Sequence, residues 1–174
     1  MPNDTIDKQS LLSFIGAIDE ELKTPMNVTA VGGTAMTLLD LKNSTQDVDF
    51  ELETKEEREK FNQAVKITET GYKVDTCIDG MIFFQQLPDD FRQKSIPVKT
   101  AFKNIRLFAL HPLDIVVTKL NRMNERDIED IGACIKKKKL TRAQVAKRAN
   151  EVYYEGNQEN AEYQIEWTLK KFFP

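Results

Sequence analysis

Apolar side chains recur along the first part of the chain at spacings that alternate between helix and strand. Residues 7–23 place Leu, Phe and Ile three or four positions apart, which predicts an amphipathic helix that ends before Pro25. The short apolar run at residues 28–31 predicts a strand that leads into two adjacent glycines. Residues 34–41 then predict a short helix whose N-terminus faces the glycine turn and directs backbone N–H groups at an anion.

The next segment predicts a second strand followed by a longer helix. Residues 47–52 alternate between polar and apolar side chains, as in a strand with one buried face. Thr54 is placed to cap a helix over residues 55–70, and Gly71 is expected to end it.

The middle of the chain predicts further strands. Residues 72–77 and 81–87 are interpreted as two strands joined into a hairpin by Asp79-Gly80, a common hairpin dipeptide. Residues 95–100 and 104–110 are expected to add one or two more strands.

Helical spacing dominates from Pro112 onward. Helices are predicted around residues 113–120, 128–135, 141–154 and 158–172. The expected fold class is therefore α/β (α+β), with a mixed sheet flanked by helices and a helical C-terminal portion. We expect two parts, an α/β core over residues 1–110 and a helical part over residues 111–174 packed on it.

Composition narrows the class of protein without identifying its chemistry. The 174 residues are 40% hydrophobic and 30% charged, which is typical of a soluble globular chain. No apolar stretch reaches the length of a membrane span and the first residues do not resemble a signal peptide, so we expect a cytoplasmic protein without a membrane partner. The net charge of −3 neither favours nor excludes a nucleic-acid partner. Cys77 and Cys134 are expected to be buried, reduced thiols.

Two glycines and two carboxylates carry the strongest chemical signal. Asp47 and Asp49 are two residues apart on a predicted strand, so their side chains point to the same side and can converge on one hard cation. Gly32 and Gly33 remove side chains where the backbone must approach a ligand closely, and phosphate is the usual ligand of such turns. Together these residues suggest chemistry on a nucleoside triphosphate (NTP).

The chain also resembles a known superfamily. Gly32-Gly33-Thr34 followed by residues 45–49 is similar to the first motif of the nucleotidyltransferase superfamily, which is related to the polymerase-β palm. Residues 112–120, followed by Arg122, Arg126-Asp127 and Asp130, resemble the Lys-plus-Arg-Asp helical motif of AbiE-type toxins and related uncharacterised nucleotidyltransferases. The two motifs together cover roughly residues 28–135.

The resemblance implies a reaction and roles for particular residues. Asp47 and Asp49 would hold Mg²⁺ (or Mn²⁺) on the triphosphate. The resemblance implies nucleotide binding by Gly32, Gly33, Thr34, Thr45, Lys119 and Arg126. Lys119 would place a positive charge on a phosphate oxygen, and Asp127 would orient Lys119 or help to deprotonate the acceptor. Asp47, Asp49, Lys119 and Asp127 are therefore the expected catalytic residues.

The resemblance implies a third metal-binding carboxylate from a later strand. The candidates are Asp75, which alternates with Lys73 and Cys77 on one strand face, and Asp79, which fits a turn better. We therefore include Asp75 with Asp47 and Asp49 in the expected metal site.

The resemblance implies partners and leaves an alternative function. Expected partners are an NTP, an acceptor hydroxyl on tRNA, another RNA or a protein, and a cognate antitoxin. The alternative is a nucleotide- or partner-binding module that keeps the fold without catalysis. Lys136–Lys139 end a predicted helix, where they compensate the helix dipole. A second hypothesis is that they contact RNA phosphates together with Arg142, Lys147 and Arg148.

Overall fold

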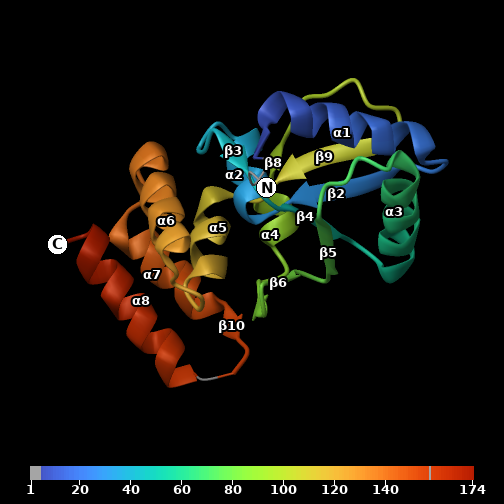
Figure 1. The fold of residues 1–174 in the computed structure, drawn as a ribbon. Helices are drawn as coiled ribbons and strands as arrows, with labels where there is room; N and C mark the ends of the chain where they lie inside the picture. Colours follow the sequence, from blue (N-terminus) through green and yellow to red (C-terminus); the bar gives the residue numbers. More distant parts are fainter. Residues whose placement is uncertain (1–4, 157) are drawn as a thin grey trace. The chain divides into compact units, whose positions relative to one another are not determined.

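The computed structural model describes residues 5–156 and 158–174, which form two compact units (Figure 1). The first unit comprises Met1–Asp79 and Ser95–Leu110, and the second comprises Gly80–Lys94 and His111–Pro174. The segment Gly80–Lys94 thus groups with the C-terminal helices, although it precedes the last strands of the first unit. Within the described ranges, no helix combines the length and apolar character needed to cross a membrane.

A mixed five-stranded sheet forms the centre of the first unit. Its strands follow the order β5 (Val74–Ile78), β4 (Val48–Leu52), β2 (Met26–Ala30), β9 (Ile105–Ala109) and β8 (Ile96–Pro97). β2 pairs antiparallel with β4 and parallel with β9, while β4 pairs parallel with β5 and β8 pairs antiparallel with β9. This mixed sheet, together with the C-terminal helices, confirms the predicted fold class.

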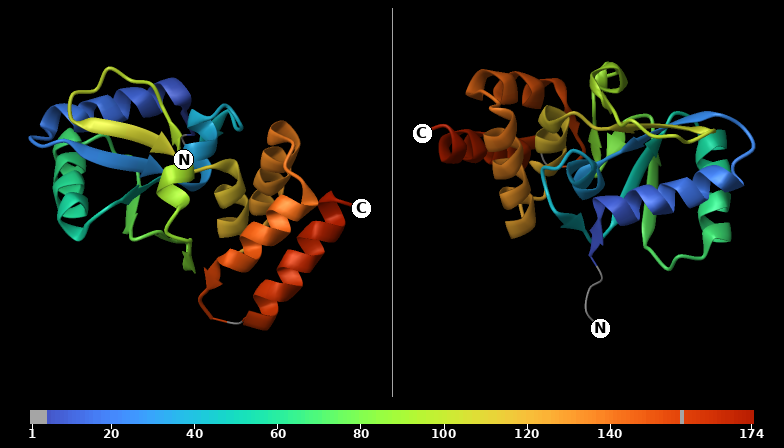
Figure 2. Two further views of the ribbon diagram at one scale, coloured as in Figure 1. Left: turned by 180° about the vertical axis from the view of Figure 1, so that it is seen from behind. Right: turned by 90° about the horizontal axis from the view of Figure 1, so that it is seen from above.

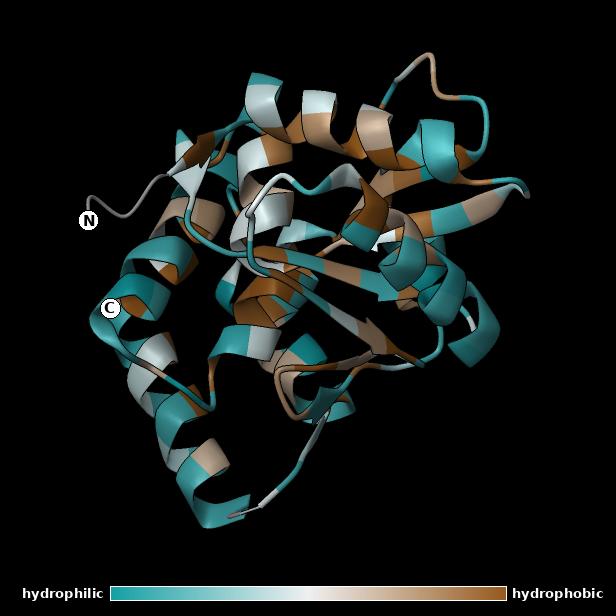
Figure 3. Ribbon diagram, turned by 45° about the vertical axis from the view of Figure 1, so that its right-hand side comes forward, coloured by the Kyte–Doolittle hydropathy of each residue, from teal (hydrophilic) through white to brown (hydrophobic). Residues whose placement is uncertain are grey.

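Helices α1 (Lys8–Glu21) and α3 (Lys55–Thr68) cover one face of this sheet. Phe50 on β4 meets Phe61 on α3 edge to face, with ring centroids 5.3 Å apart. Both rings are completely buried, so this contact belongs to the core. Figure 3 shows the same division, with brown apolar residues along the strands and teal polar residues on the outer turns of the helices.

Local capping explains where these two helices begin. The Asp7 side chain accepts a hydrogen bond from the Ser10 amide at the start of α1. At the start of α3, Thr54 and Glu57 exchange hydrogen bonds in a capping box, which confirms the predicted cap. α3 ends at Thr68 because Glu69 adopts a left-handed conformation (φ 45°), so the helix stops before the predicted Gly71.

A buried carboxylate fastens the end of α1 to the start of β9. Asp19 is 4% exposed and accepts hydrogen bonds from the backbone amides of Lys103, Asn104 and Ile105 at 2.7–2.8 Å. These bonds satisfy three backbone donors that lie far from α1 in the sequence.

The second unit consists of helices and a small sheet. Its helices are α4 (Phe91–Lys94), α5 (Pro112–Lys119), α6 (Glu125–Lys138), α7 (Arg142–Glu151) and α8 (Gln158–Phe172). The sheet has the order β10 (Tyr153–Tyr154), β7 (Gln85–Gln86) and β6 (Met81–Ile82). Figure 2 shows α7 and α8 running side by side in this unit, and the Gly132 backbone of α6 meets the Phe172 ring of α8.

Three sequence predictions about these elements are wrong. α2 spans Gly32–Leu38, so the glycines form its first turn instead of preceding a helix over residues 34–41. β5 does not form a hairpin with the residues after Asp79-Gly80, because β5 pairs parallel with β4 after the α3 crossover. Tyr153 and Tyr154 do not continue α7: they form β10, which pairs with β7.

Candidate active site

Glycine is needed at positions 32 and 33, after the end of β2, for two different reasons. Gly32 has φ +54°, a left-handed conformation that glycine adopts without steric cost. Gly33 is restricted by its surroundings, because a Cβ atom built there would lie 2.6 Å from the Thr45 hydroxyl oxygen. Thr45 itself belongs to the short strand β3 (Ser44–Thr45), which pairs with β1 (Ile6–Asp7). The glycine pair therefore allows the start of α2 to lie directly against β3.

Two threonine hydroxyls attach this turn to the segment that carries Asp47 and Asp49. The Thr34 hydroxyl donates to the carbonyl oxygen of Asp47 (3.2 Å) and accepts from the amide of Asp49 (2.9 Å). The Thr45 hydroxyl donates to the same Asp47 carbonyl at 2.9 Å. Thr34 is completely buried, so its hydroxyl stabilises the protein's own backbone in this structure. The expected phosphate contacts of Thr34 and Thr45 remain predictions.

Asp49 lies on the sheet face opposite α1 and α3. Val48, Phe50 and Leu52 are buried toward those helices, so by strand alternation Asp49 points to the other face. Asp49 is half-buried, while Asp47, one residue before β4, is exposed. The amide of Val31 donates to the Asp49 carbonyl at 3.1 Å, which fixes the start of β4 beside the glycine turn.

The candidate third carboxylate is the register partner of Asp49. β4 and β5 pair in parallel with Asp49 directly opposite Asp75, and such partners project to the same face of a sheet. The Asp75 side chain is 62% exposed and lies 3.5 Å from the Lys73 ammonium. Asp79 has φ 57° in the turn after β5. The pairing therefore favours Asp75 over Asp79 as the partner of Asp49.

Glu51 is a buried carboxylate on the same face that the sequence analysis did not select. It lies two residues after Asp49 and is 1% exposed. Burial, together with the negative charges of Glu51 and Asp49, raises the pKa of the neighbouring Cys77 thiol to about 12. Glu51 could have been identified from the sequence, because the two-residue spacing of acidic residues continues from Asp47 through Asp49 to Glu51.

The residues of the second sequence motif form a buried ion cluster in the second unit. Lys119 is 3% exposed, and its ammonium lies 3.1 Å from Asp127 Oδ1 and 3.0 Å from Asp130 Oδ2. Arg122 donates to the same Asp127 oxygen at 2.9 Å, and its guanidinium lies over the Phe83 ring. Lys119, Asp127 and Asp130 are buried, and the exposed Arg122 adds a second cation to this cluster from the surface.

This cluster changes how Lys119 and Arg126 are interpreted. Lys119 contacts Asp127, as the resemblance implied, but its charge is directed into the interior in this structure. Arg126, expected to bind the nucleotide, is exposed on the first turn of α6. The roles of all three residues toward a nucleotide remain predictions.

Arg148 is not available for the RNA contact that the sequence suggested. It is 2% exposed, and its guanidinium forms two hydrogen bonds to Asp114 and one each to Asp90 and Glu151. These bonds join α7 to α5 and to the residues before α4. The prediction for Arg148 is wrong because the carboxylate of the buried Asp114 requires a cation. Lys136–Lys139 are exposed at the end of α6, as expected for compensation of the helix dipole.

His111 and the cysteines have structural positions. His111 caps α5, with its Nδ1 accepting from the Leu113 amide at 3.1 Å. Burial lowers the pKa of His111, which favours the neutral ring that this cap needs. Both cysteines are free thiols; Cys134 is buried and Cys77 is partly exposed.

The structure therefore divides the expected site residues between the two units. The first unit brings together Gly32, Gly33, Thr34, Thr45, Asp47, Asp49 and Asp75. The second unit brings together Lys119 and Asp127, while Arg126 lies at the start of α6.

The donor chemistry of the first unit fits a hard divalent cation. Carboxylate oxygens are the ligands that Mg²⁺ prefers. Asp49 and Asp75 supply them from one sheet face, and Asp47 lies in the bend just before β4. Among residues 5–156 and 158–174, no three His, Cys, Asp or Glu side chains are grouped as a preformed metal site. The fit therefore rests on the type and register of the donors.

Comparison with known proteins places the chain in a family. No curated protein and no solved structure gives a significant match. A family model matches residues 9–172, which include every expected site residue of both units. The chain therefore belongs to the family described as "Nucleotidyltransferase of unknown function (DUF6036)".

Proposed function

We propose that this protein is a Mg²⁺-dependent nucleotidyltransferase that transfers a nucleoside monophosphate from an NTP to a hydroxyl group of an RNA or a protein. The register of β4 and β5 is the observation that carries the proposal. This register sets Asp75 opposite Asp49 on one sheet face. Asp47 precedes Asp49 by two residues. Membership in a nucleotidyltransferase family agrees with this chemistry.

The reaction requires charge neutralisation and alignment more than covalent help from the protein. A bond forms between the acceptor oxygen and the α-phosphorus, the bond from that phosphorus to the β-phosphate oxygen breaks, and pyrophosphate leaves as the acceptor loses its proton. Asp47, Asp49 and Asp75 would hold the metal. Bound Mg²⁺ supplies positive charge for the triphosphate.

The glycine turn has a separate part in this proposal. We assign phosphate binding to the backbone N–H groups at the start of α2, where Gly32 and Gly33 lie. The space beside Gly33 is filled by the Thr45 hydroxyl, so the phosphate would contact the backbone N–H groups and would not enter the space of a missing side chain. Thr34 contributes indirectly, since its hydrogen bonds hold the backbone of Asp47 and Asp49 against this turn.

We assign Lys119 and Asp127 to the same reaction, on the condition that Lys119 gives up one of its carboxylate partners when the nucleotide binds. The Lys119 ammonium is shared by Asp127 and Asp130, so contact with a phosphate oxygen means exchanging one carboxylate for the phosphate. Asp127 released in this exchange is a candidate for accepting the acceptor proton. Arg126, exposed on the same helix, is a further candidate for binding phosphate.

The acceptor and the partner are the finer parts of the proposal. The resemblance to AbiE-type toxins supports an RNA end, such as that of tRNA, or a protein side chain as the acceptor. It also supports a cognate antitoxin as a binding partner in the cytoplasm.

Labelled NTPs incubated with total RNA and total protein test the proposal directly. We expect Mg²⁺-dependent incorporation by the wild type, and a fall of about a hundredfold or more in the Asp47→Asn/Asp49→Asn variant. Asp89→Asn changes an exposed aspartate outside the site and serves as the matched control. Equal incorporation by the wild type and the double variant would contradict the assigned roles of Asp47 and Asp49.

Binding measurements separate catalysis from binding alone. Titration calorimetry with each NTP in the presence and absence of Mg²⁺ shows whether the nucleotide binds. Mg²⁺-dependent binding without any product would reject catalysis and favour the nucleotide-binding module with the same fold.

A further inference from the structure

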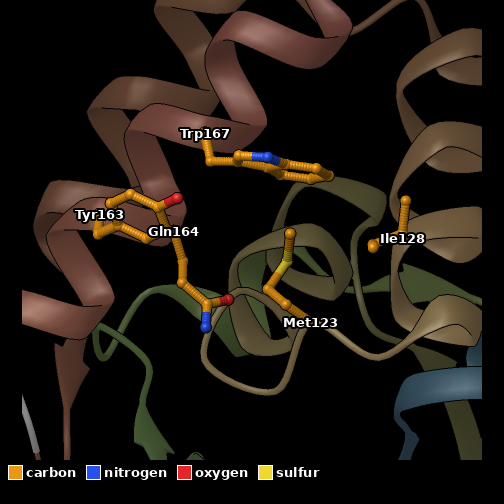
Figure 4. Close-up of a pocket in the computed structure, with 5 residues that line it drawn as sticks. All are labelled: Met123, Ile128, Tyr163, Gln164 and Trp167. Atoms are coloured by element: carbon orange, nitrogen blue, oxygen red, sulfur yellow. The ribbon is translucent and has the colours of Figure 1, made fainter.

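The second unit contains a pocket that has no part in the proposed reaction. Its volume is about 180 Å³, and it is lined by Met123, Ile128, Tyr163, Gln164 and Trp167. The residues come from α8, from the start of α6 and from the turn before α6 (Figure 4). An engineered cavity of roughly 150 Å³ holds benzene, so a pocket of this size suits a planar ring.

The side walls of the pocket suit a flat aromatic ligand. Figure 4 shows the Trp167 ring lying across one side, with the Met123 thioether facing it. The indole offers a large flat surface for stacking, and the flexible Met123 side chain adapts to what lies against it. The Thr168 hydroxyl contacts the Met123 sulfur at 3.9 Å, and Met123 has an unusual positive φ of 47°. Strained conformations of this kind tend to persist where they serve a site.

The pocket also contains a polar group that needs a donor. The side-chain oxygen of Gln164 is buried and accepts no hydrogen bond from the residues that the structure describes. Figure 4 shows this oxygen directed toward Met123. A buried acceptor without a donor costs free energy, and a ligand N–H group that donates to it recovers this cost. An aliphatic or phenyl ligand would leave the cost in place.

A positive charge lies beside the aromatic wall. The Lys171 ammonium lies 5.2 Å from the centre of the Trp167 ring. The same ammonium lies 5.9 Å from the centre of the Phe172 ring. Lys171 is exposed, so an anionic group attached to a ring in the pocket can reach it. The pocket therefore suits a ligand with a flat ring, an N–H donor and an attached anionic group, and a nucleotide has all three.

We propose that this pocket binds a nucleobase with an exocyclic amino group, stacked on Trp167, with the amino group donating to the Gln164 side-chain oxygen. The phosphate attached to the base lies toward Lys171. This site is separate from the carboxylates of the first unit and does not depend on the proposed transfer reaction. The base comes from a free nucleotide or from an unpaired position of an RNA strand.

Trp167 is the only tryptophan of the chain, so the tryptophan fluorescence of the protein comes from a residue that lines this pocket. Adenosine monophosphate is titrated against purine riboside monophosphate, which has the same ring system without the amino group. We expect quenching by adenosine monophosphate, with an affinity about fivefold higher than for the second probe. Equal affinities, or no quenching by adenosine monophosphate, would overturn the proposal without any variant being made.

Gln164→Leu tests the hydrogen bond, with Gln158→Leu, an exposed glutamine on the same helix, as the matched control. The preference for the amino group should disappear in the first variant and persist in the second. A preference that survives in Gln164→Leu would contradict the assigned contact.

Two further arms identify the source of the base and its independence from the active site. Adenosine monophosphate should quench the Asp47→Asn/Asp49→Asn variant as strongly as it quenches the wild type. Loss of quenching in this variant would mean that the signal arises from the active site and that the pocket proposal is wrong. Tighter binding of a single-stranded adenylate pentamer than of adenosine monophosphate identifies RNA as the source, while equal binding identifies a free nucleotide.

Discussion

Gly33 and Thr45 show how one pair of residues sets the geometry of the candidate site. The Thr45 hydroxyl occupies the space where a side chain at position 33 would lie, and it donates to the Asp47 carbonyl. Glycine is therefore required at position 33 by packing against Thr45, while Gly32 is required by its backbone angle. The motif that the sequence predicts to bind phosphate therefore also positions the segment that carries Asp47 and Asp49.

This packing predicts that Gly33→Ala and Thr45→Ala are not additive. Gly33→Ala forces the new methyl group against the Thr45 hydroxyl and should lower the free energy of unfolding by about 2 kcal/mol. Thr45→Ala should cost about 1 kcal/mol through its lost hydrogen bond. In the double variant the closest remaining contact is at the ordinary distance of 3.4 Å, so its cost should be clearly smaller than the sum.

Urea unfolding of the four proteins measures this coupling. A double variant whose loss of unfolding free energy equals the sum of the two single losses would show that the Thr45 hydroxyl does not exclude a side chain at position 33.

The first turn of helix α5 is held by two groups, His111 and Asp114, that the sequence presents as ordinary polar residues. His111 caps its first turn, and Asp114 binds Arg148 of α7. Burial raises the pKa of Asp114, and its hydrogen bonds to Arg148 oppose that rise. The cap of α5 was foreseeable, since His111 precedes Pro112 at a helix start. The Arg148 contact was not, because α7 and α5 meet only through the tertiary fold.

The cap on α5 predicts a pH-dependent stability. The pKa of His111 is lowered in the folded protein by burial, so the unfolded chain binds a proton more readily. The stabilisation is therefore fully present above the unfolded pKa of about 6.5 and is lost as the pH falls below that value toward the folded pKa. His111 is the only histidine, which leaves few other groups that titrate in this window.

His111→Asn provides the comparison, because asparagine caps helices and does not titrate. We expect urea unfolding to show that the wild type loses more stability than His111→Asn between pH 7.5 and pH 5.5. Equal losses in the two proteins would mean that His111 does not contribute to the pH dependence.

At the scale of the whole molecule, the local patterns were predictable and the non-local pairings were not. The capping box at Thr54 and the amphipathic helices follow from residues close in sequence. The parallel pairing of β5 with β4 depends on the α3 crossover between them, so the hairpin dipeptide Asp79-Gly80 was misleading.

The same distinction applies to the candidate site. Asp47 and Asp49 were identified from a two-residue spacing, but only the sheet register relates Asp75 to Asp49. The burial of Lys119 between Asp127 and Asp130 was equally hidden, since a sequence motif does not tell whether a cation faces solvent or an internal carboxylate.

Metal binding by the three aspartates is the central claim, and Mn²⁺ binding followed by electron paramagnetic resonance tests it most directly. The protein is titrated with Mn²⁺ in the presence of non-hydrolysable analogues of the four NTPs. Asp49→Asn and Asp75→Asn should each weaken Mn²⁺ binding about tenfold or more, whereas Asp89→Asn should bind as the wild type does. Wild-type affinity in Asp75→Asn would contradict the assignment of Asp75 to the metal site, and wild-type affinity in Asp49→Asn would contradict the site itself.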